Sequence, residues 1–180
     1  MQIVKGWLTG VNLCPSPNYN TRPADTAISL LVVHNISLPP GQFGTGCIAQ
    51  FFQNQLDHSA HPYFHHLRDT QVSAHCLIDR SGEITQFVSF NDRAWHAGRS
   101  IFDGVEECND YSIGVELEGT DELAYTESQY LSLSKLTRLL MIEFPSIRSS
   151  RITGHSDVAP GRKTDPGPAF DWDKLHASLK

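Results

Sequence analysis

The apolar segment over residues 28–33, Ile-Ser-Leu-Leu-Val-Val, restricts most strongly how this chain can fold, and it leads directly into His34. A near-continuous apolar run of this length is typical of a β-strand that is covered on both faces. Strands of this kind lie at the centre of a sheet that is packed between helices. The segment therefore predicts an α/β protein in which His34 stands at the C-terminal end of a central strand.

Helical and strand patterns alternate along the rest of the chain. Apolar residues at helical spacing and a capping box that opens at Thr126 indicate helices, and apolar runs beside turn residues indicate strands. In the first half of the chain the pattern predicts a helix over 45–56, a loop over 57–71, a hairpin of 72–78 with 83–88 and an irregular segment over 91–110. In the second half it predicts a strand over 112–118, a helix that begins at 126 and ends at Pro145, a strand over 151–153 and a short helix from Asp171. The hairpin makes the expected central β-sheet mixed, with helices flanking it.

Length and composition limit the organisation and the partners of the chain. We expect the 180 residues to form a single domain, with a polar, proline-rich N-terminal arm over residues 1–26 and a core over residues 27–180. The net charge of −6 argues against nucleic acid or an anionic membrane as a partner. No segment resembles a signal peptide or a bilayer span, and the four cysteines are widely spread. We therefore expect reduced thiols in a cytoplasmic protein, which we take to be a monomer.

Two histidines and one aspartate occupy positions that suit a metal site. His155 follows the short predicted strand over residues 151–153, and Asp165 lies in the loop Lys-Thr-Asp-Pro-Gly over residues 163–167. Taken singly, His34 and His155 could be hydrogen-bonded core histidines, and Asp165 could cap a turn. Together they match a catalytic zinc site, in which three protein ligands leave the fourth position to water. The combination predicts one zinc ion per chain.

Glu116 and Lys163 are candidates for the chemistry beside that ion. Glu116 lies on the alternating segment over residues 112–118, and Gly114 beside it is expected to leave open space on that face. A carboxylate next to a metal-activated water can act as general base and then as general acid. A solvent-facing glutamate is the alternative, and it suits Glu118 better. Lys163 is either a surface cation or a charge that stabilises a tetrahedral oxyanion.

Other histidines and the cysteines allow further interpretations. The cluster of His58, His61, His65 and His66 could bind a second metal, but Pro62 interrupts the helical pairing, so a solvated loop is favoured. A metal-independent Cys/His hydrolase stays open, and it requires a cysteine to meet a histidine in space. His75 and Cys76 cannot form that pair, because neighbouring side chains on a strand point to opposite faces.

The residues over 95–98, Trp-His-Ala-Gly, offer an aromatic surface that could stack on a sugar or anchor the loop. His75 is expected to line the site or orient a ligand. We therefore take Asn35, His75, Trp95 and His96 as candidate substrate-binding residues.

Several strings that follow one another in order resemble the AmpD-type N-acetylmuramoyl-L-alanine amidases, namely residues 31–41, 72–78, 93–98, 108–121 and 162–168. The resemblance implies a fold shared with phage lysozyme-type amidases and peptidoglycan recognition proteins. It also implies a cytoplasmic zinc amidase of peptidoglycan recycling, which cleaves the amide between 1,6-anhydro-N-acetylmuramic acid and L-alanine in muropeptides and so damps β-lactamase induction. Carried over by position, the zinc ligands are His34, His155 and Asp165, and the catalytic pair is Glu116 and Lys163.

The chain departs from the family pattern at three positions. Ala74 stands where more distant relatives carry a catalytic tyrosine, so loss of Glu116 should leave no substitute. Gln71 and Glu107 stand where close relatives carry basic residues that meet the carboxylates of the stem peptide. A non-catalytic muropeptide-binding module on the same fold is the alternative function, and the complete set of ligand candidates argues against it.

Overall fold

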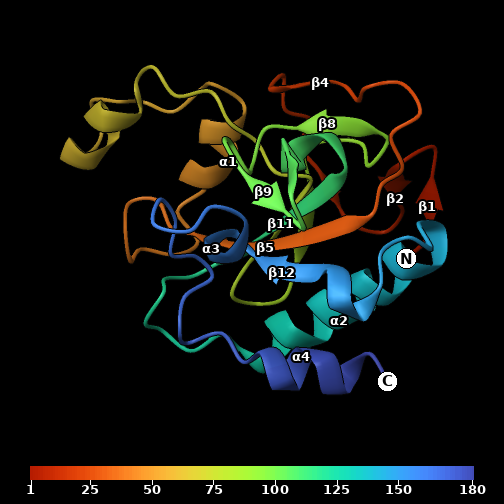
Figure 1. Cartoon of the computed structure of the whole chain (residues 1–180). Helices are drawn as coiled ribbons and strands as arrows, with labels where there is room; N and C mark the ends of the chain where they lie inside the picture. The colour runs from red at the N-terminus through yellow and green to blue at the C-terminus, as the bar shows by residue number, and fades with distance from the viewer.

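The computed structural model describes residues 1–180 and has a six-stranded mixed sheet at its centre (Figure 1). The strands lie in the order β12 (Ile152–Gly154), β5 (Leu30–Ile36), β11 (Ser112–Glu118), β6 (Cys76–Ile78), β7 (Ile84–Gln86) and β3 (Asn12–Leu13). β5 pairs in parallel with both β11 and β12, and β6 pairs in parallel with β11 but antiparallel with β7. The predicted α/β class, the mixed sheet and the hairpin are therefore confirmed.

The two central strands are buried along most of their length. The first five residues of β5, Leu30 to His34, and all seven residues of β11 are buried, as a strand covered on both faces requires. β5 continues for two residues past His34, so His34 lies within the strand and not at its end. The expectation that Glu118 faces solvent is wrong, because Glu118 is 4% exposed. The backbone N–H groups of Gly44 and Arg80 donate to its carboxylate, at 2.6 and 3.3 Å.

Two helices cover one face of the sheet, and in Figure 1 they lie below it. α2 (Glu127–Glu143) opens with the predicted capping box, and it ends before Pro145 as expected. α4 (Trp172–Ser178) is capped by Asp171, whose side chain accepts from the Lys174 N–H. Apolar residues of β11 and of α2 share the largest core cluster: Ile113, Val115, Leu117, Leu133, Leu136 and Leu140.

The opposite face carries shorter helices. α1 (Cys47–Phe52) is shorter than the helix predicted over 45–56, because Asn54 adopts a left-handed backbone conformation with a φ of 59°. The segment predicted as a loop contains the 3₁₀-helix η1 (Pro62–Leu67), which begins with a proline after the cap residue His61. This segment, yellow in Figure 1, projects from the body of the protein.

The remaining elements are small and lie at the edges. The segment predicted as irregular contains β8 (Asp92–Ala94), the hairpin of β9 (Ile101–Phe102) and β10 (Val105–Glu106), and the 3₁₀-helix η2 (Cys108–Asp110). The N-terminal residues form β1 (Ile3–Val4), β2 (Trp7–Leu8), β3 and β4 (Tyr19–Thr21), and the last two pair with β7 and β8. The 3₁₀-helix η3 (Ser149–Arg151) precedes β12, and α3 (His155–Val158) follows it.

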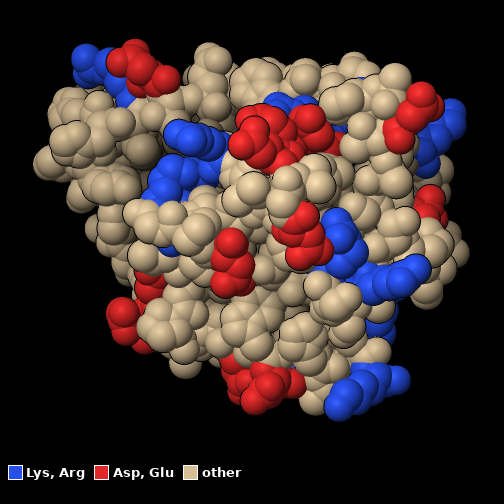
Figure 2. Space-filling view, viewed as in Figure 1, with Lys and Arg blue, Asp and Glu red and all other residues tan.

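Charged groups of both signs are interspersed over the face that Figure 2 shows. No helix is long and apolar enough to cross a membrane.

Candidate metal centre

The pairing of the two central strands places His34 beside Glu116. β5 and β11 are parallel, and His34 and Glu116 are register partners. Register partners on adjacent strands point to the same face of a sheet and lie about 4.8 Å apart. Backbone hydrogen bonding alone therefore brings a candidate ligand and a candidate proton carrier to the same face.

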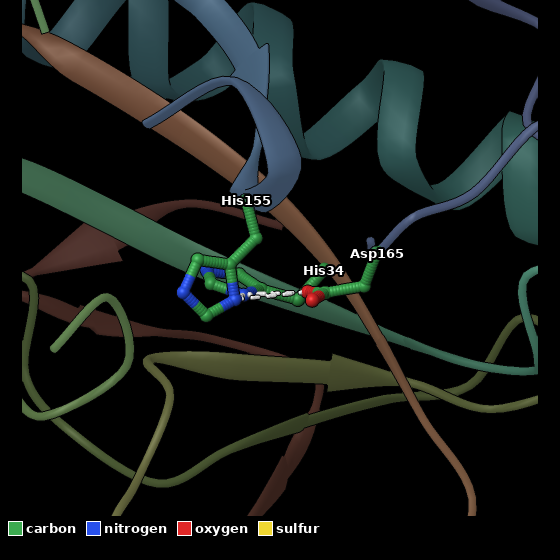
Figure 3. Close-up of side chains that lie close together, drawn as sticks. All are labelled: His34, His155 and Asp165. Carbon is green, nitrogen blue, oxygen red and sulfur yellow. Dashed lines mark hydrogen bonds and ion pairs between the residues drawn. The ribbon is translucent and has the colours of Figure 1, made fainter. Parts of the chain in front are cut away.

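His155, from the start of α3, and Asp165, from a loop, both point towards His34 (Figure 3). His155 is the first residue of α3, directly after β12, which pairs with β5. The three facing atoms form a small triangle: His34 Nδ1 lies 2.9 Å from His155 Nδ1, and both lie 3.0–3.1 Å from Asp165 Oδ2. These are the residues whose ligand atoms could jointly hold a metal ion.

The donor set fits a zinc ion. His155 Nε2 lies 3.1 Å from the carbonyl oxygen of Ala97, which can only accept, so the ring proton sits on Nε2 and Nδ1 offers a lone pair. In the neutral ring this lone pair points at a carboxylate oxygen 3.0 Å away, and a cation bound by both atoms stabilises that arrangement. Tetrahedral zinc, with bonds of about 2.0 Å, separates its ligands by about 3.3 Å, close to the edges of this triangle.

The protonation of these groups also suits a metal. Burial lowers the pKa of His34 to about 4, so the ring is neutral near pH 7 and free to bind. Burial alone would raise the pKa of Asp165, but the facing His155 and His34 rings hold it below its ordinary value. The site therefore presents the neutral imidazole of His34 and the carboxylate of Asp165 on facing sides.

Glu116 carries an unusual carboxylate. It is 9% exposed, and its Oε2 atom is buried without a hydrogen-bond partner. Burial raises the pKa of Glu116 well above its ordinary value, Asp165 raises it further, and Lys163 opposes both. A carboxyl group whose pKa is shifted towards neutrality is suited to proton transfer.

The space predicted beside Glu116 is filled, and this corrects the expectation of an open face at Gly114. A Cβ atom on Gly114 would lie 2.4 Å from Cγ of His96, so the ring of His96 packs where a side chain would otherwise stand. His96 Nδ1 lies 2.9 Å from His34 Nε2, and His96 Nε2 lies 3.1 Å from Ser112 Oγ. His96 is thus in contact with a member of the triangle.

A cleft of about 600 Å³ opens beside the triangle, and most of the predicted site residues line it: Asn35, Trp95, His96, Glu116, His155, Lys163 and Asp165. Lys163 is exposed at this cleft. The amide of Asn35 donates to Asp121 Oδ1 at 2.8 Å and to the Pro166 carbonyl at 3.1 Å, so it ties β5 to the loop of Asp165. The indole N–H of Trp95 donates to Asn20 at 2.7 Å.

His75 does not reach the cleft. Its side chain is fully buried at 0% exposure, and it contacts Arg22, the Asp92 carbonyl and the Gly114 N–H, all within 3.1 Å. Its ring packs edge-on against His96, with the ring centres 5.7 Å apart. His75 therefore supports the residues behind the site and does not fit the predicted contact with substrate.

Several other candidates lie away from the triangle. Asp157, a carboxylate two residues after His155, accepts from the Gly154 N–H and the Thr153 hydroxyl, so it caps α3. The histidines over residues 58–66 belong to the projecting segment, where His61 caps η1. None of the four cysteines lines the cleft or hydrogen-bonds a histidine, which leaves the Cys/His interpretation without support.

Sequence reasoning missed the apolar wall of the cleft and Asp121. The wall contains Leu38, Phe51, Phe52, Leu67 and Val72 together with the more exposed Tyr63. Apolar wall residues have the same sequence pattern as core residues, so no local signal distinguishes them. Asp121 follows the end of β11 closely, and a polar residue just past a central strand is a signal that could have identified it.

Comparisons with known proteins agree with this geometry. The family model described as N-acetylmuramoyl-L-alanine amidase matches residues 24–168. The 1,6-anhydro-N-acetylmuramyl-L-alanine amidase AmpD of Salmonella typhimurium is 56% identical over 173 residues, which cover 96% of this chain and 92% of that protein.

Two solved structures show the same fold. A crystal structure of a selenomethionine derivative of AmpD is 53% identical, covers 100% of both chains and has a TM-score of 0.97. The Escherichia coli amidase AmiD, in complex with the substrate anhydro-N-acetylmuramic acid-L-Ala-D-γ-Glu-L-Lys, is 28% identical with a TM-score of 0.63, covering 87% of this chain and 60% of that one. The chain belongs to the N-acetylmuramoyl-L-alanine amidase family.

Proposed function

We propose that this amidase uses one zinc ion to hydrolyse the amide bond between 1,6-anhydro-N-acetylmuramic acid and L-alanine in muropeptides. One observation carries the proposal: three ligand atoms of His34, His155 and Asp165 lie within 4.8 Å of one another, beside a cleft that also holds the unpaired carboxylate of Glu116. The names of the relatives point to the same bond.

His34, His155 and Asp165 would hold the zinc ion, which supplies a Lewis acid and activates water at neutral pH. Glu116 would then take the proton of the attacking water and return it to the departing alanine nitrogen. Its raised pKa makes the carboxylate a stronger base for taking up that proton.

Lys163 would stabilise the negative charge that develops on the carbonyl oxygen. Its ammonium group lies on the wall of the same cleft, and it forms no salt bridge that would compete for its charge. A fixed positive charge directed at a developing oxyanion is a common source of rate acceleration in acyl transfer.

The proposed substrate is a small muropeptide in the cytoplasm, where its removal would serve peptidoglycan recycling and indirectly restrain β-lactamase induction. Trp95 and the apolar wall offer surfaces for a sugar ring, while Asn35 and His96 border the reacting centre. The proposal includes a monomer and excludes nucleic acid and membrane as partners, in keeping with the acidic net charge of −6.

Mass spectrometry of an anhydro-muropeptide digest tests the proposal. The untreated protein should release the free stem peptide, a chelator should stop the release, and added zinc should restore it. Intact peptidoglycan serves as the comparison substrate, and it should be cleaved far more slowly. Product formation that resists the chelator would overturn the zinc assignment, and tight binding without any product would favour the non-catalytic module.

A further inference from the structure

We infer that two consecutive residues, His96 and Ala97, orient both histidines of the metal centre, and that Asn109 fixes them in position. The inference rests on the proposed function, since it assumes that His34 and His155 bind zinc. His96 and Ala97 lie in the loop that joins β8 to β9. They act as positioning residues, one through its side chain and the other through its backbone.

The Ala97 carbonyl sets the orientation of His155. Its oxygen lies 3.1 Å from His155 Nε2 and accepts the ring proton, which directs the Nδ1 lone pair towards Asp165 and His34. Arg162 also donates to this carbonyl from the other side, so the oxygen is held by two partners.

The His96 side chain sets the orientation of His34. When His34 Nδ1 binds a metal, the proton of that ring must sit on Nε2, and His96 Nδ1 stands 2.9 Å away to accept it. His96 then carries its own proton on Nε2, where the Ser112 hydroxyl oxygen accepts it at 3.1 Å. Each ring nitrogen of His34 and His96 then has one role, as metal ligand, hydrogen-bond donor or hydrogen-bond acceptor.

Asn109 holds the backbone that carries both contacts. Its side-chain oxygen accepts from the N–H of His96 at 3.1 Å and from the N–H of Ala97 at 2.8 Å, and the residue is 4% exposed. Gly114 contributes the space in which the His96 ring lies. A shift of this one loop would therefore disturb both ligand histidines together.

Hydrogen-bond partners of metal ligands commonly change metal affinity by about 10- to 100-fold when they are removed. Two substitutions at His96 separate hydrogen bonding from packing. His96→Phe keeps the bulk over Gly114 but cannot accept from His34, whereas His96→Asn loses bulk but places an oxygen near the position of Nδ1.

The zinc dissociation constant, measured by competition with a chromogenic chelator, is the readout, with thermal unfolding of the metal-free protein measured in parallel. His96→Phe should weaken zinc binding about 10- to 100-fold, and His96→Asn should recover much of that loss. The reverse order, with Asn weaker than Phe, would show that His96 acts by packing and would overturn the inference.

Asn109→Ala tests the anchor, and Asn91→Ala is the matched control, because Asn91 is an exposed loop asparagine whose side chain makes no hydrogen bond. Asn109→Ala should weaken zinc binding by at least about 10-fold, and the control should bind as the parent does. Equal zinc affinity in Asn109→Ala and the control would overturn the role of Asn109. Zinc binding by the unmodified protein, and its loss in His34→Ala, test the proposed function separately. If the unmodified protein bound no zinc, or if His34→Ala bound zinc equally well, the proposed function itself would be wrong.

Discussion

His34 and Glu116 lie on central strands, whereas His155, Asp165 and His96 lie beyond the strand ends, on α3 and in loops, and the two sets owe their positions to different interactions. The sheet residues are fixed by the backbone register of β5 and β11. The residues beyond the strand ends depend on specific polar contacts. Two backbone N–H groups donate to the side-chain oxygen of Asn109, and the Asn35 amide donates to the Pro166 carbonyl. Loss of one such contact should therefore move the residues beyond the strand ends and change their contacts with His34, while the register of β5 and β11 is kept.

The largest effect is expected on removing a ligand from either set. His34→Ala and Asp165→Ala should each lose the bound zinc and nearly all activity, because three protein ligands are the usual number at a catalytic zinc site. His34→Ala should also weaken the metal-free fold, by about 2 kcal/mol or more, since it leaves a cavity in a buried strand. Metal analysis and urea unfolding measure the two effects. Stoichiometric zinc in Asp165→Ala would contradict the ligand assignment.

Glu116→Gln separates proton transfer from metal binding within the sheet set. The variant should keep its fold and its zinc, while kcat falls by about 100- to 10,000-fold, the usual range for a lost general acid–base. KM should change much less than kcat, because the carboxylate acts in the transition state. Zinc content and single-turnover cleavage are measured on one preparation. Near-normal cleavage would refute the role, and loss of zinc would make Glu116 part of the metal site.

Gly114→Ala tests the contact between the two sets. The new methyl group would meet the His96 ring, so the loop has to move while the strand keeps its conformation. We expect zinc affinity to fall about 10-fold and the free energy of unfolding to fall by about 1–3 kcal/mol, as overpacking usually costs. Chelator competition and urea unfolding check this result. Unchanged zinc affinity would mean that His96 can move without consequence for His34.

Acid should also destabilise the metal-free protein, and this effect needs no change at the metal site. Burial lowers the pKa of His75 to about 3, so between pH 6.5 and pH 3 the unfolded chain binds a proton there that the folded protein does not. Stability should fall as the pH drops through this window, by about 1.4 kcal/mol per pH unit from this group. His34 acts in the same direction, and Glu116, with its raised pKa, acts in the opposite one.

Comparison with His75→Gln isolates the contribution of His75, because the other groups are common to both proteins. Urea unfolding of the two metal-free proteins at several pH values gives the free energy of unfolding as a function of pH. Its slope should be smaller for the variant, by the amount that corresponds to the uptake of about one proton. Identical slopes would contradict the buried, neutral state of His75.

The contrast between the strand residues and the residues beyond the strand ends also explains which parts of the fold could be predicted from the sequence. The central strands, the capped helix α2 and the hairpin have local patterns, and they were predicted with errors of a few residues at their ends. The length of α1 could not be predicted, because Asn54 just after it is left-handed and its side chain hydrogen-bonds the distant Asn18. Glu118 was misjudged because its partners, Gly44 and Arg80, are backbone groups from distant segments.

The candidate site was predictable where residue type carries the information. His34, His155 and Asp165 could be proposed because few residue types bind zinc, and the structure brings these three together. The placement of His75 behind the site and of His96 over Gly114 could not be predicted, because both depend on how the loop after β8 packs on the sheet. Loop packing of this kind leaves no periodic pattern in the sequence.

The separation of 121 residues between His34 and His155 also determines when the metal centre can form. A chain that is still being synthesised presents His34 long before His155 and Asp165 exist, and β12, which places His155, pairs with β5 only late in synthesis. Contacts so distant in sequence form slowly, because a long loop must close first. The proposed zinc site is therefore complete only after residue 165 has been synthesised and β12 has paired with β5, so a chain truncated before that residue should lack the proposed activity.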